Sequence, residues 1–490
     1  MRHIVPFFLC VGLVAGCDGG SAGTGGDGGT GTGGNGGSGG TSTGGQGGAG
    51  AGTSTGGGGG AGGAECDAIV TFADGKSPTK ELHVATTGDD GGDGSAQSPF
   101  ATIEKAVSLA TPGTSVVIHE GTYPGGTYLS DVIGSADAPI WVGGAQGEAR
   151  PVIDGGGEAL HITKARYLVV HGLEARNQTS NGVNVDDGGE YDDEDATRYI
   201  VFANLSIHDV GDGGNQDCLK LSGLNDYWIL DSEMFACGGS GAGSAVDHVG
   251  CHRGVLAGNF IHDLGGTGIQ CKGGSADIDI RRNRLISAGE RAVNMGGSTG
   301  FEFFRPPLSD TMPNAEARRI NVYANVFQGS TVPVAFVGCV DCRVVNNTFV
   351  DPENWLMRIL QETVSSPPYD FEPAQNGFYA NNLVYFDRST LSGEDVNVGG
   401  DTDAASFTFT NNLWFAHDDP SASAPVTLPS PDMASIAGQD PALADPAAGD
   451  HSIAAGSPAA GKGTAQGGVA ADITGACYAD PPSIGAHEVK

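Results

Sequence analysis

A short phrase that begins with asparagine recurs through the chain and restricts its fold more than any other feature. In each copy, Asn, or Asp once, precedes apolar residues, and a Gly-rich turn and another short apolar strand follow. Successive copies lie 22 to 42 residues apart and begin at Asn204, Asp231, Asn259, Asn283, Asn325, Asn347, Asn382 and Asn412. A period in the twenties, lengthened in places by insertions, is typical of a solenoid whose coils bury a face only by stacking on their neighbours.

The repeated unit holds short strands and turns without helical periodicity, so we expect the solenoid to be built from β-strands. Asparagine at a fixed coil position has a physical reason. Its side-chain amide can donate to one neighbouring coil and accept from the other, which forms a ladder along the stack. We therefore predict a structural role for these asparagines.

Composition excludes one class of partner. The 490 residues carry 24 basic and 58 acidic side chains, a formal net charge of −34. Affinity for a phosphate backbone depends on Lys and Arg side chains, so we expect no nucleic-acid partner.

The first 64 residues are expected to direct export of the chain rather than to form part of its folded domain. Arg2 and His3 precede an apolar stretch that ends in Leu-Val-Ala-Gly-Cys17, and a Gly-rich tract follows at once. This resembles a bacterial lipoprotein signal peptide, which implies removal of residues 1–16 and lipidation of Cys17. Residues 17–64 are then a flexible tether, and the rest of the chain is exported and lipid-anchored to the cell envelope, outside the cytoplasm. An ordinary secretory signal peptide is the alternative, and it also predicts export.

Eight further cysteines follow the tether, at positions 66, 218, 237, 251, 271, 339, 342 and 477. An even number in an exported chain is compatible with disulfides, although the sequence does not decide among the pairings. Cys66 and Cys477 flank the folded region, so one bridge can tie its ends together. Cys339 and Cys342 form a lone CxxC motif, which we interpret as structural or disulfide-bonded rather than as a metal or redox site.

The segments Leu82–Asp90, Ser98–Val107 and Glu120–Tyr123 resemble the N-terminal cap of right-handed parallel β-helix proteins of the pectate-lyase-like superfamily. The resemblance implies an all-β solenoid over residues 65–490, with a short amphipathic capping helix near residues 99–109. We expect the cap at residues 80–125, the coils at about 126–415 and a C-terminal tail at 416–490. This fold hosts lyases, hydrolases, epimerases and adhesins, so it does not by itself imply an activity.

One strand in each coil carries polar residues between apolar ones. If its apolar residues face inward, alternation sends Asn184, Lys220, Gln270 and Asn294 outward on one sheet. His248 or Asp247 joins them, depending on the register, and Lys272 lies two positions along the same face from Gln270. The only two lysines between residues 165 and 461 both fall in this row.

The row suits β-elimination on a uronate polysaccharide, in which a base removes the proton beside a neutralised carboxylate. In β-helix lyases a Lys or Arg on this sheet acts as the base beside Ca²⁺ held by acidic residues. The resemblance thus implies Lys220 as the base, with Asp217, His248 and Lys272 as further catalytic candidates. Asp217 and Asp247 are the candidate Ca²⁺ ligands, and Arg253 and Arg291 are candidates for holding a substrate carboxylate. The outward amides of Asn184, Gln270 and Asn294 are further candidates for substrate binding.

Two insertions are expected to flank the row. Residues 296–319 carry Phe301, Phe303 and Arg305, which are candidates for substrate binding, and residues 361–376 carry further aromatic rings. Aromatic faces pack against sugars, but the same rings can instead pack the loops against the solenoid. The acidic run at 186–195 can either bind Ca²⁺ or form a solvated insertion, and we favour the insertion.

The sequence therefore predicts a monomeric, carbohydrate-active protein with an acidic polysaccharide as its partner, most simply a uronate polysaccharide lyase. Two alternatives stay open. One is a glycoside hydrolase that uses Asp217 and Asp247 as its paired carboxylates. The other is a non-catalytic module that binds glycans or a partner in the cell envelope.

Overall fold

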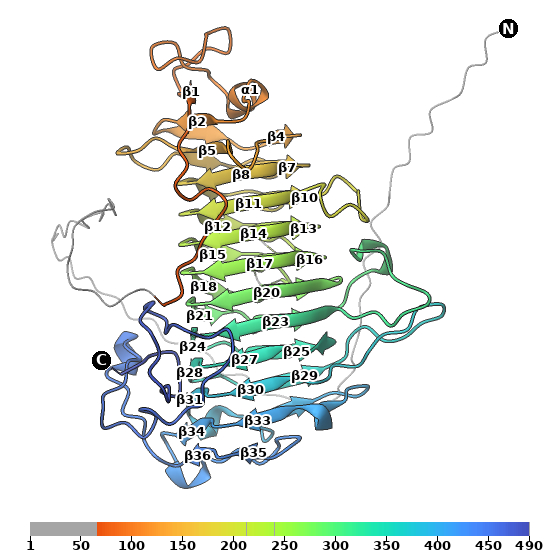
Figure 1. Ribbon diagram of the computed structural model, residues 1–490, viewed down its shortest axis with the longest axis vertical. Coiled ribbons are helices and arrows are strands. Elements are labelled where there is room, and N and C mark those ends of the chain that lie inside the picture. The colour runs from red at the N-terminus through yellow and green to blue at the C-terminus, as the bar shows by residue number, and fades with distance from the viewer. Residues whose placement is uncertain (1–65, 212, 240, 490) are drawn as a thin grey trace, which may run out of the picture. The chain divides into compact units, whose positions relative to one another are not determined.

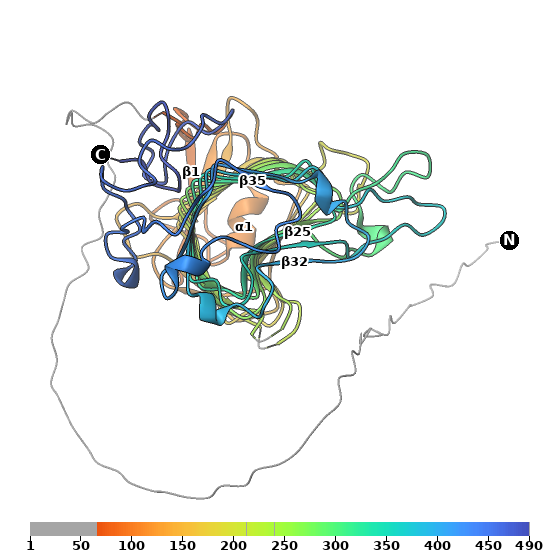
Figure 2. The same cartoon turned by 90° about the horizontal axis from the view of Figure 1, so that it is seen from below.

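The computed structural model describes residues 66–211, 213–239 and 241–489. The predicted signal peptide, Cys17 and the whole Gly-rich tether lie outside these residues. The described chain winds into a right-handed parallel β-helix with three sheets (Figures 1 and 2). The predicted fold class is confirmed.

Each complete coil contributes to all three sheets, in the order sheet 3, sheet 1, sheet 2. Within the described residues, sheet 1 has fourteen strands. They are β1 (Lys80–Val84), β2 (Thr114–Ile118), β5 (Ile140–Gly144), β8 (Arg166–His171), β11 (Arg198–Ala203), β14 (Asn225–Leu230), β17 (His252–Ala257), β20 (Ser275–Arg281), β23 (Ala317–Tyr323), β26 (Cys339–Val340), β27 (Arg343–Val345), β30 (Phe378–Ala380), β33 (Thr408–Thr410) and β35 (Asp432–Met433).

Sheet 2 has twelve strands and sheet 3 has ten, counted over the same residues. Sheet 2 consists of β3 (Thr122–Pro124), β6 (Val152–Asp154), β9 (Glu174–Arg176), β12 (Ser206–Val210), β15 (Glu233–Cys237), β18 (Phe260–Leu264), β21 (Arg284–Ala288), β24 (Val326–Gln328), β28 (Thr348–Val350), β31 (Leu383–Phe386), β34 (Leu413–Ala416) and β36 (Ile436–Ala437). Sheet 3 consists of β4 (Thr127–Ser130), β7 (Leu160–Thr163), β10 (Val183–Asp186), β13 (Leu219–Ser222), β16 (Ser244–Val249), β19 (Thr267–Lys272), β22 (Arg291–Gly296), β25 (Val332–Val337), β29 (Met357–Leu360) and β32 (Val396–Val398).

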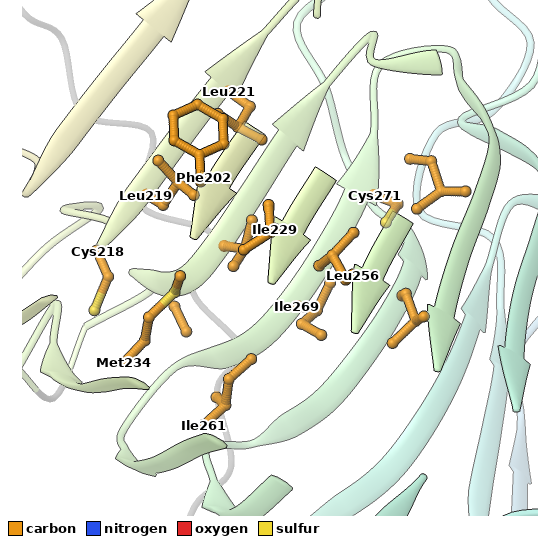
Figure 3. Close-up of a cluster of buried hydrophobic side chains, with 14 of the residues drawn as sticks. Phe202, Cys218, Leu219, Leu221, Ile229, Met234, Leu256, Ile261, Ile269 and Cys271 are labelled. Carbon is orange, nitrogen blue, oxygen red and sulfur yellow. The ribbon is translucent and has the colours of Figure 1, made fainter. Parts of the chain in front are cut away.

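Side chains that alternate inward from the three sheets fill the interior of the coils (Figure 3). The residues predicted to face inward from sheet 3 are all at most 3% exposed: Val183, Val185, Leu219, Leu221, Ile269, Cys271, Val293 and Met295. Strand alternation therefore assigns the faces of sheet 3 correctly.

The asparagine ladder runs through six coils. Asn259, Asn283, Asn325, Asn347, Asn382 and Asn412 are buried, and each of the first five donates its Nδ2 to the Oδ1 of the next at 2.9–3.2 Å. Asn204 and Asp231 are exceptions to the prediction. Both are exposed and have positive φ, and they lie one residue before the ladder position. Ser232 occupies that position and accepts from the backbone N–H of Leu205.

A helix closes the first coil, as predicted. Helix α1 (Ile103–Ser108) buries Ile103, Ala106 and Val107 against the open end, and the Thr102 side chain accepts from the Lys105 backbone N–H at its N-terminus. The other helices of the described chain are single 3₁₀ turns, η1 (Phe301–Phe303), η2 (Arg388–Thr390), η3 (Ala404–Ser406), η4 (Pro420–Ala422) and η5 (Pro446–Ala448). No helix in the described part is long and apolar enough to cross a membrane.

Residues 66–79 form a strap that runs back over the outside of sheet 1 towards β1 (Figure 1). Near its start, the backbone carbonyl of Asp67 accepts from Arg282, which follows β20, at 3.1 Å. Further along, the Phe72 ring packs edge-on against Tyr167, Tyr199 and Trp228 of three successive coils. The strap therefore fastens coils that are far apart in the stack.

The C-terminal tail also lies along the outside of the coils. Asn346 and Asn381, which precede ladder asparagines, donate to the tail carbonyls of Ser483 and Thr464. A disulfide joins Cys66 of the strap to Cys477 of the tail, which confirms that a bridge ties the ends together. The other disulfides of the described residues are Cys218–Cys237 and Cys339–Cys342, so the CxxC motif is disulfide-bonded, while Cys251 and Cys271 are free and buried.

Candidate active site in a groove of sheet 3

The register of sheet 3 sets the order of the outward residues. Parallel pairing aligns one residue from each successive strand: Tyr128, His161, Asn184, Lys220, Asp247, Gln270, Asn294, Ala335, Arg358 and Asn397. A second row, two residues later, includes Thr163, Asp186, Ser222, Val249 and Lys272. Neighbouring strands lie about 4.8 Å apart, so groups in adjacent coils can touch.

A groove of about 680 Å³ lies over these two rows at their N-terminal coils. Its floor includes Asn184, Lys220 and Lys272 from sheet 3, and its walls come from the segments near residues 187–191 and 298–305. Both lysines of the long stretch 165–461 therefore face the same hollow.

The two lysines meet over a buried carboxylate. Lys220 Nζ and Lys272 Nζ both contact Asp247 Oδ2, the second at 3.3 Å, and Lys220 Nζ lies 3.4 Å from Asp217 Oδ2. Asp217 and Asp247 are each 1% exposed, whereas the Lys220 side chain is 20% exposed. The ammonium groups thus cover the carboxylates on the side that faces the groove.

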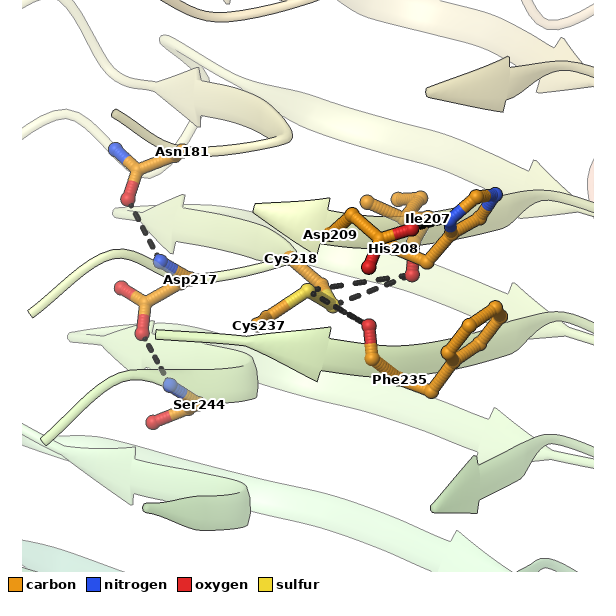
Figure 4. Close-up of a disulfide and its surroundings, with 9 residues drawn as sticks. All are labelled: Asn181, Ile207, His208, Asp209, Asp217, Cys218, Phe235, Cys237 and Ser244. Carbon is orange, nitrogen blue, oxygen red and sulfur yellow. Dashed lines mark hydrogen bonds and ion pairs between the residues drawn. A yellow bond between two sulfur atoms is a disulfide. The ribbon is translucent and has the colours of Figure 1, made fainter. Parts of the chain in front are cut away.

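Asp217 is fixed by the coils on both sides (Figure 4). Its backbone N–H donates to Asn181 Oδ1 at 3.0 Å, and its Oδ1 accepts from the Ser244 backbone N–H at 2.8 Å. The next residue, Cys218, is held to Cys237 by a disulfide. These contacts hold the carboxylate in place beneath Lys220.

Burial and neighbouring charges shift the pKa values of this cluster in opposite directions. Burial and the Asp247 carboxylate raise the pKa of Asp217 to about 7. Burial also raises the pKa of Asp247, but the Lys272 and Lys220 ammonium groups outweigh it, and the net shift is downward. Burial lowers the pKa of Lys220, but the Asp247 and Asp217 carboxylates outweigh it and raise the pKa overall. The ammonium form of Lys220 is therefore favoured at rest.

His248 is not in the outward row. The register places Asp247 there, while His248 pairs with Leu221 and Cys271 and is fully buried inside the coil. Its Nδ1 lies 2.8 Å from the Gln270 carbonyl oxygen, and burial lowers its pKa to about 4. The expectation that His248 faces a substrate is wrong, because a one-residue change in register reverses the face of a strand residue.

Several predicted substrate-binding residues lie away from the groove. Arg253 is on β17 of sheet 1, where it pairs with Asp226 at 2.9 Å and with Glu194 at 3.0 Å. Arg291 is on sheet 3 but pairs with Glu362 at 2.7 Å, outside the groove lining. Gln270 and Asn294 also lie outside that lining, further along the same row.

Arg305 joins the two insertions that wall the groove. Its guanidinium is buried against the Asp187 carboxylate, with Nη2 3.2 Å from Oδ1, and lies 4.0 Å from the centre of the Tyr191 ring. A Cβ atom at Gly223 would lie 2.2 Å from Asp187 Oδ2, and one at Gly250 would lie 2.4 Å from Arg305 Cβ. Glycine at both positions therefore leaves space for the ion pair, which makes Arg305 a structural residue of the wall.

The aromatic residues of the insertions divide into two groups. Phe301 packs against Tyr369 and Phe371, and the buried ring of Phe304 also packs against Phe371, so these rings hold the loops to each other. Phe303 is 49% exposed and lines the groove. Of the rings in residues 296–319 and 361–376, Phe303 is the one that lines the groove, and Tyr191 lines it from the other wall.

Sequence reasoning missed residues at the other end of the groove. Tyr128 is 51% exposed and stands edge-on to His161, with ring centres 5.1 Å apart. His161 Nε2 lies 2.7 Å from Asp186 Oδ2, and His161 Nδ1 lies 3.2 Å from Glu158 Oε2. Both strands precede the first recognisable asparagine phrase, so the repeat gave no register there.

Comparisons with known proteins agree with the fold. Residues 82–263 match the sequence profile of a family described as Pel9A-like, right handed beta helix region. No curated protein matches the sequence.

Solved structures similar to the chain include that of pectate lyase Pel9A, which is 15% identical, with a TM-score of 0.52 over 85% of this chain and 98% of that one. The GH136 lacto-N-biosidase from Eubacterium ramulus is 14% identical, with a TM-score of 0.45 over 73% of this chain and 67% of the other. XylC in complex with xylose is 13% identical, with a TM-score of 0.46 over 74% and 87%. At these identities the likeness shows the fold alone.

Proposed function

We propose that the protein is a polysaccharide lyase that cleaves a uronate polymer by β-elimination in the groove of sheet 3. One observation carries the proposal. The two lysines between residues 165 and 461 both line this groove and meet over Asp247. A similar solved structure, with a TM-score of 0.52, is that of a pectate lyase, which is consistent with the proposal.

In this mechanism the neutral amine of Lys220 takes the proton from the carbon beside the sugar carboxylate. The electron pair of that C–H bond forms a carbon–carbon double bond, the adjacent C–O bond breaks, and the leaving oxygen takes a proton from water. The Lys272 ammonium contacts one carboxylate of the chain and has further N–H donors, with which it holds the sugar carboxylate. Asn184, Phe303 and Tyr128 line the groove as sugar contacts.

Lys220 must first lose a proton, because the Asp247 and Asp217 carboxylates favour its ammonium form. Activity is therefore expected under alkaline conditions.

The ammonium form of Lys220 also favours a second candidate function, a glycan-binding module. In such a module both ammonium groups bind sugar carboxylates, and no reaction takes place. The hydrolase alternative gains no such support, since Asp217 and Asp247 lie beneath the lysines and outside the groove lining.

The test is incubation of the purified protein with a panel of uronate polysaccharides at several alkaline pH values, with detection of the unsaturated product by ultraviolet absorbance. Elimination on at least one polymer supports the lyase. Binding to a polymer without product formation supports the glycan-binding module instead.

A separate proposal concerns the location of the protein. Mass spectrometry of the mature protein is expected to find lipid on Cys17 and no residues 1–16.

A further inference from the structure

Among the described residues, the chain supplies a cation or a hydrogen-bond donor to each of the four aspartates that line the groove or lie directly beneath it. Asp186 accepts from the Thr163 hydroxyl at 2.7 Å and contacts His161, and Asp187 is buried against Arg305. In the next two coils, Asp217 and Asp247 lie beneath the Lys220 and Lys272 ammonium groups.

This arrangement does not fit a calcium ion. Calcium takes six to eight oxygen ligands. Among the described residues, Asp247 Oδ1 is the one oxygen of these four carboxylates that has neither a hydrogen bond nor an ion pair. Asp217 Oδ2 also lacks a hydrogen bond, but it lies 3.4 Å from Lys220 Nζ. Asp247 Oδ1 is buried with its residue, which is 1% exposed. One buried oxygen falls far short of a coordination shell.

The local charge leads to the same result. Asp217 and Asp247 carry two negative charges when ionised, and Lys220 and Lys272 carry two positive charges at contact distance. A divalent cation near Asp247 would lie close to both ammonium groups, and like charges at such separations repel strongly in a partly buried site. Calcium binding would therefore require the displacement of a lysine side chain.

We infer that the chain's own lysine ammonium groups occupy the positions that calcium ions would take in this groove, so that it binds an acidic ligand without a divalent cation. The identity of the ligand rests on the proposed function, but the exclusion of calcium can be measured without any substrate. Within the mechanism, the inference makes Lys272 the group that neutralises the substrate carboxylate.

The first experiment compares thermal unfolding of the wild-type protein in EDTA, in CaCl₂ and in MgCl₂ at equal ionic strength. A specific site that binds the folded state raises the melting temperature as the ligand concentration exceeds the Kd. We expect the CaCl₂ and MgCl₂ curves to coincide, because a net charge of −34 attracts either ion to the surface equally. A calcium-specific rise in the wild type overturns the inference.

The second experiment removes one ammonium group. Lys220→Met leaves Asp217 and Asp247 with a single cation, so we expect a lower melting temperature that CaCl₂, but not MgCl₂, partly restores. Arg319→Met is the matched control, because it removes a cation from an exposed ion pair with Asp277 on sheet 1. If Lys220→Met does not fold, Lys272→Met tests the same carboxylates. The absence of a calcium response in whichever variant folds contradicts the idea that lysine occupies the position of the ion.

Assays with polymer separate this inference from the proposed function. Elimination that continues in EDTA supports both ideas. Elimination that requires calcium retains the lyase and overturns the inference. If no polymer is cleaved and the wild type shows no calcium response, the lyase proposal fails while the assignment of the lysines stands.

Discussion

Two stacks of polar side chains run along the same solenoid, and they differ in composition, burial and partners. The asparagine ladder repeats one residue type from Asn259 to Asn412, and its members are buried and bond to one another. The outward row of sheet 3 changes at every coil, from His161 through Asn184 and Lys220 to Asp247. Its members face a groove or contact charges of neighbouring coils.

The difference shows how a row of stabilising residues can be told from a row of functional residues in a repeat protein. Each ladder asparagine meets the same environment in every coil, so one residue satisfies it every time. A ligand in the groove meets each coil at a different point, so each coil needs a different group. A row that repeats one residue type is therefore expected to contribute to stability, and a row whose residue type changes from coil to coil is expected to contribute to activity.

The largest expected effect is on activity. Lys220→Ala removes the proposed base, and loss of a general base costs about 10²- to 10⁴-fold in rate. The solenoid should remain folded, although it is less stable because Asp217 and Asp247 lose one cation, and circular dichroism checks this. Lys462→Ala, which removes an exposed lysine of the tail, is the control and should leave the rate unchanged. Full activity in Lys220→Ala would eliminate the mechanism.

The next effect is on stability. Asn259→Ala leaves the buried carbonyl of Ile229 and the Oδ1 of Asn283 without this donor, which costs about 1–3 kcal/mol. Chemical denaturation measures this change, and the activity per folded molecule should not change. Asn204→Asp is the matched control, because Asn204 begins the same phrase but is exposed and lies outside the ladder, and Asp tolerates its positive φ and can still accept from Arg150. Equal stability of the two variants would mean that the ladder does not stabilise the stack.

The pH dependence tests which group in the groove acts as the base. Burial lowers the pKa of Lys220, but the Asp247 and Asp217 carboxylates outweigh it, so the pKa lies above its ordinary value of 10.5. Below that pKa the neutral amine increases about tenfold per pH unit, and kcat/KM should rise with the same slope through pH 10. Initial rates at constant ionic strength measure the profile. A plateau that begins near pH 7 would instead show that a group other than Lys220 acts as the base.

The smallest effect is expected at the other end of the cluster. Lys272→Ala removes the proposed partner of the substrate carboxylate, so KM should rise about tenfold, equivalent to roughly 1.4 kcal/mol, while kcat changes little. Steady-state kinetics on the best polymer separates the two constants. A large loss of kcat with unchanged KM would give Lys272 a role in the chemical step.

The sequence predicts the solenoid well, because its period and its alternation follow directly from stacked coils. Alternation also places Asn184 and Lys220 on the outer face, where the structure has them. It cannot choose between Asp247 and His248, because the two residues are adjacent and apolar residues, Val246 and Val249, flank the pair on both sides. The register against neighbouring strands was needed to decide.

Contacts across long separations could not be predicted. Arg253 is polar and close in sequence to the row, but it lies on another sheet, where Asp226 binds it. The Arg305–Asp187 pair joins two insertions 118 residues apart, and neither insertion has a repeat that fixes its path. The sequence period predicts which residues share a face of the solenoid, but it does not predict which part of the solenoid an insertion contacts.

The strap determines where a mechanical force enters the domain. A stack of coils that is pulled from its first strand would peel one coil at a time, because each coil contacts only its neighbours. Here the chain enters at Cys66, which is bonded to Cys477 of the tail, while Asp67 is held by Arg281 and Arg282 at the end of β20. Tension from the preceding segment therefore reaches the middle coils and the C-terminal tail together. The cap at β1 and the groove of sheet 3 lie outside this path, so the protein can be pulled by its N-terminal side without opening either of them.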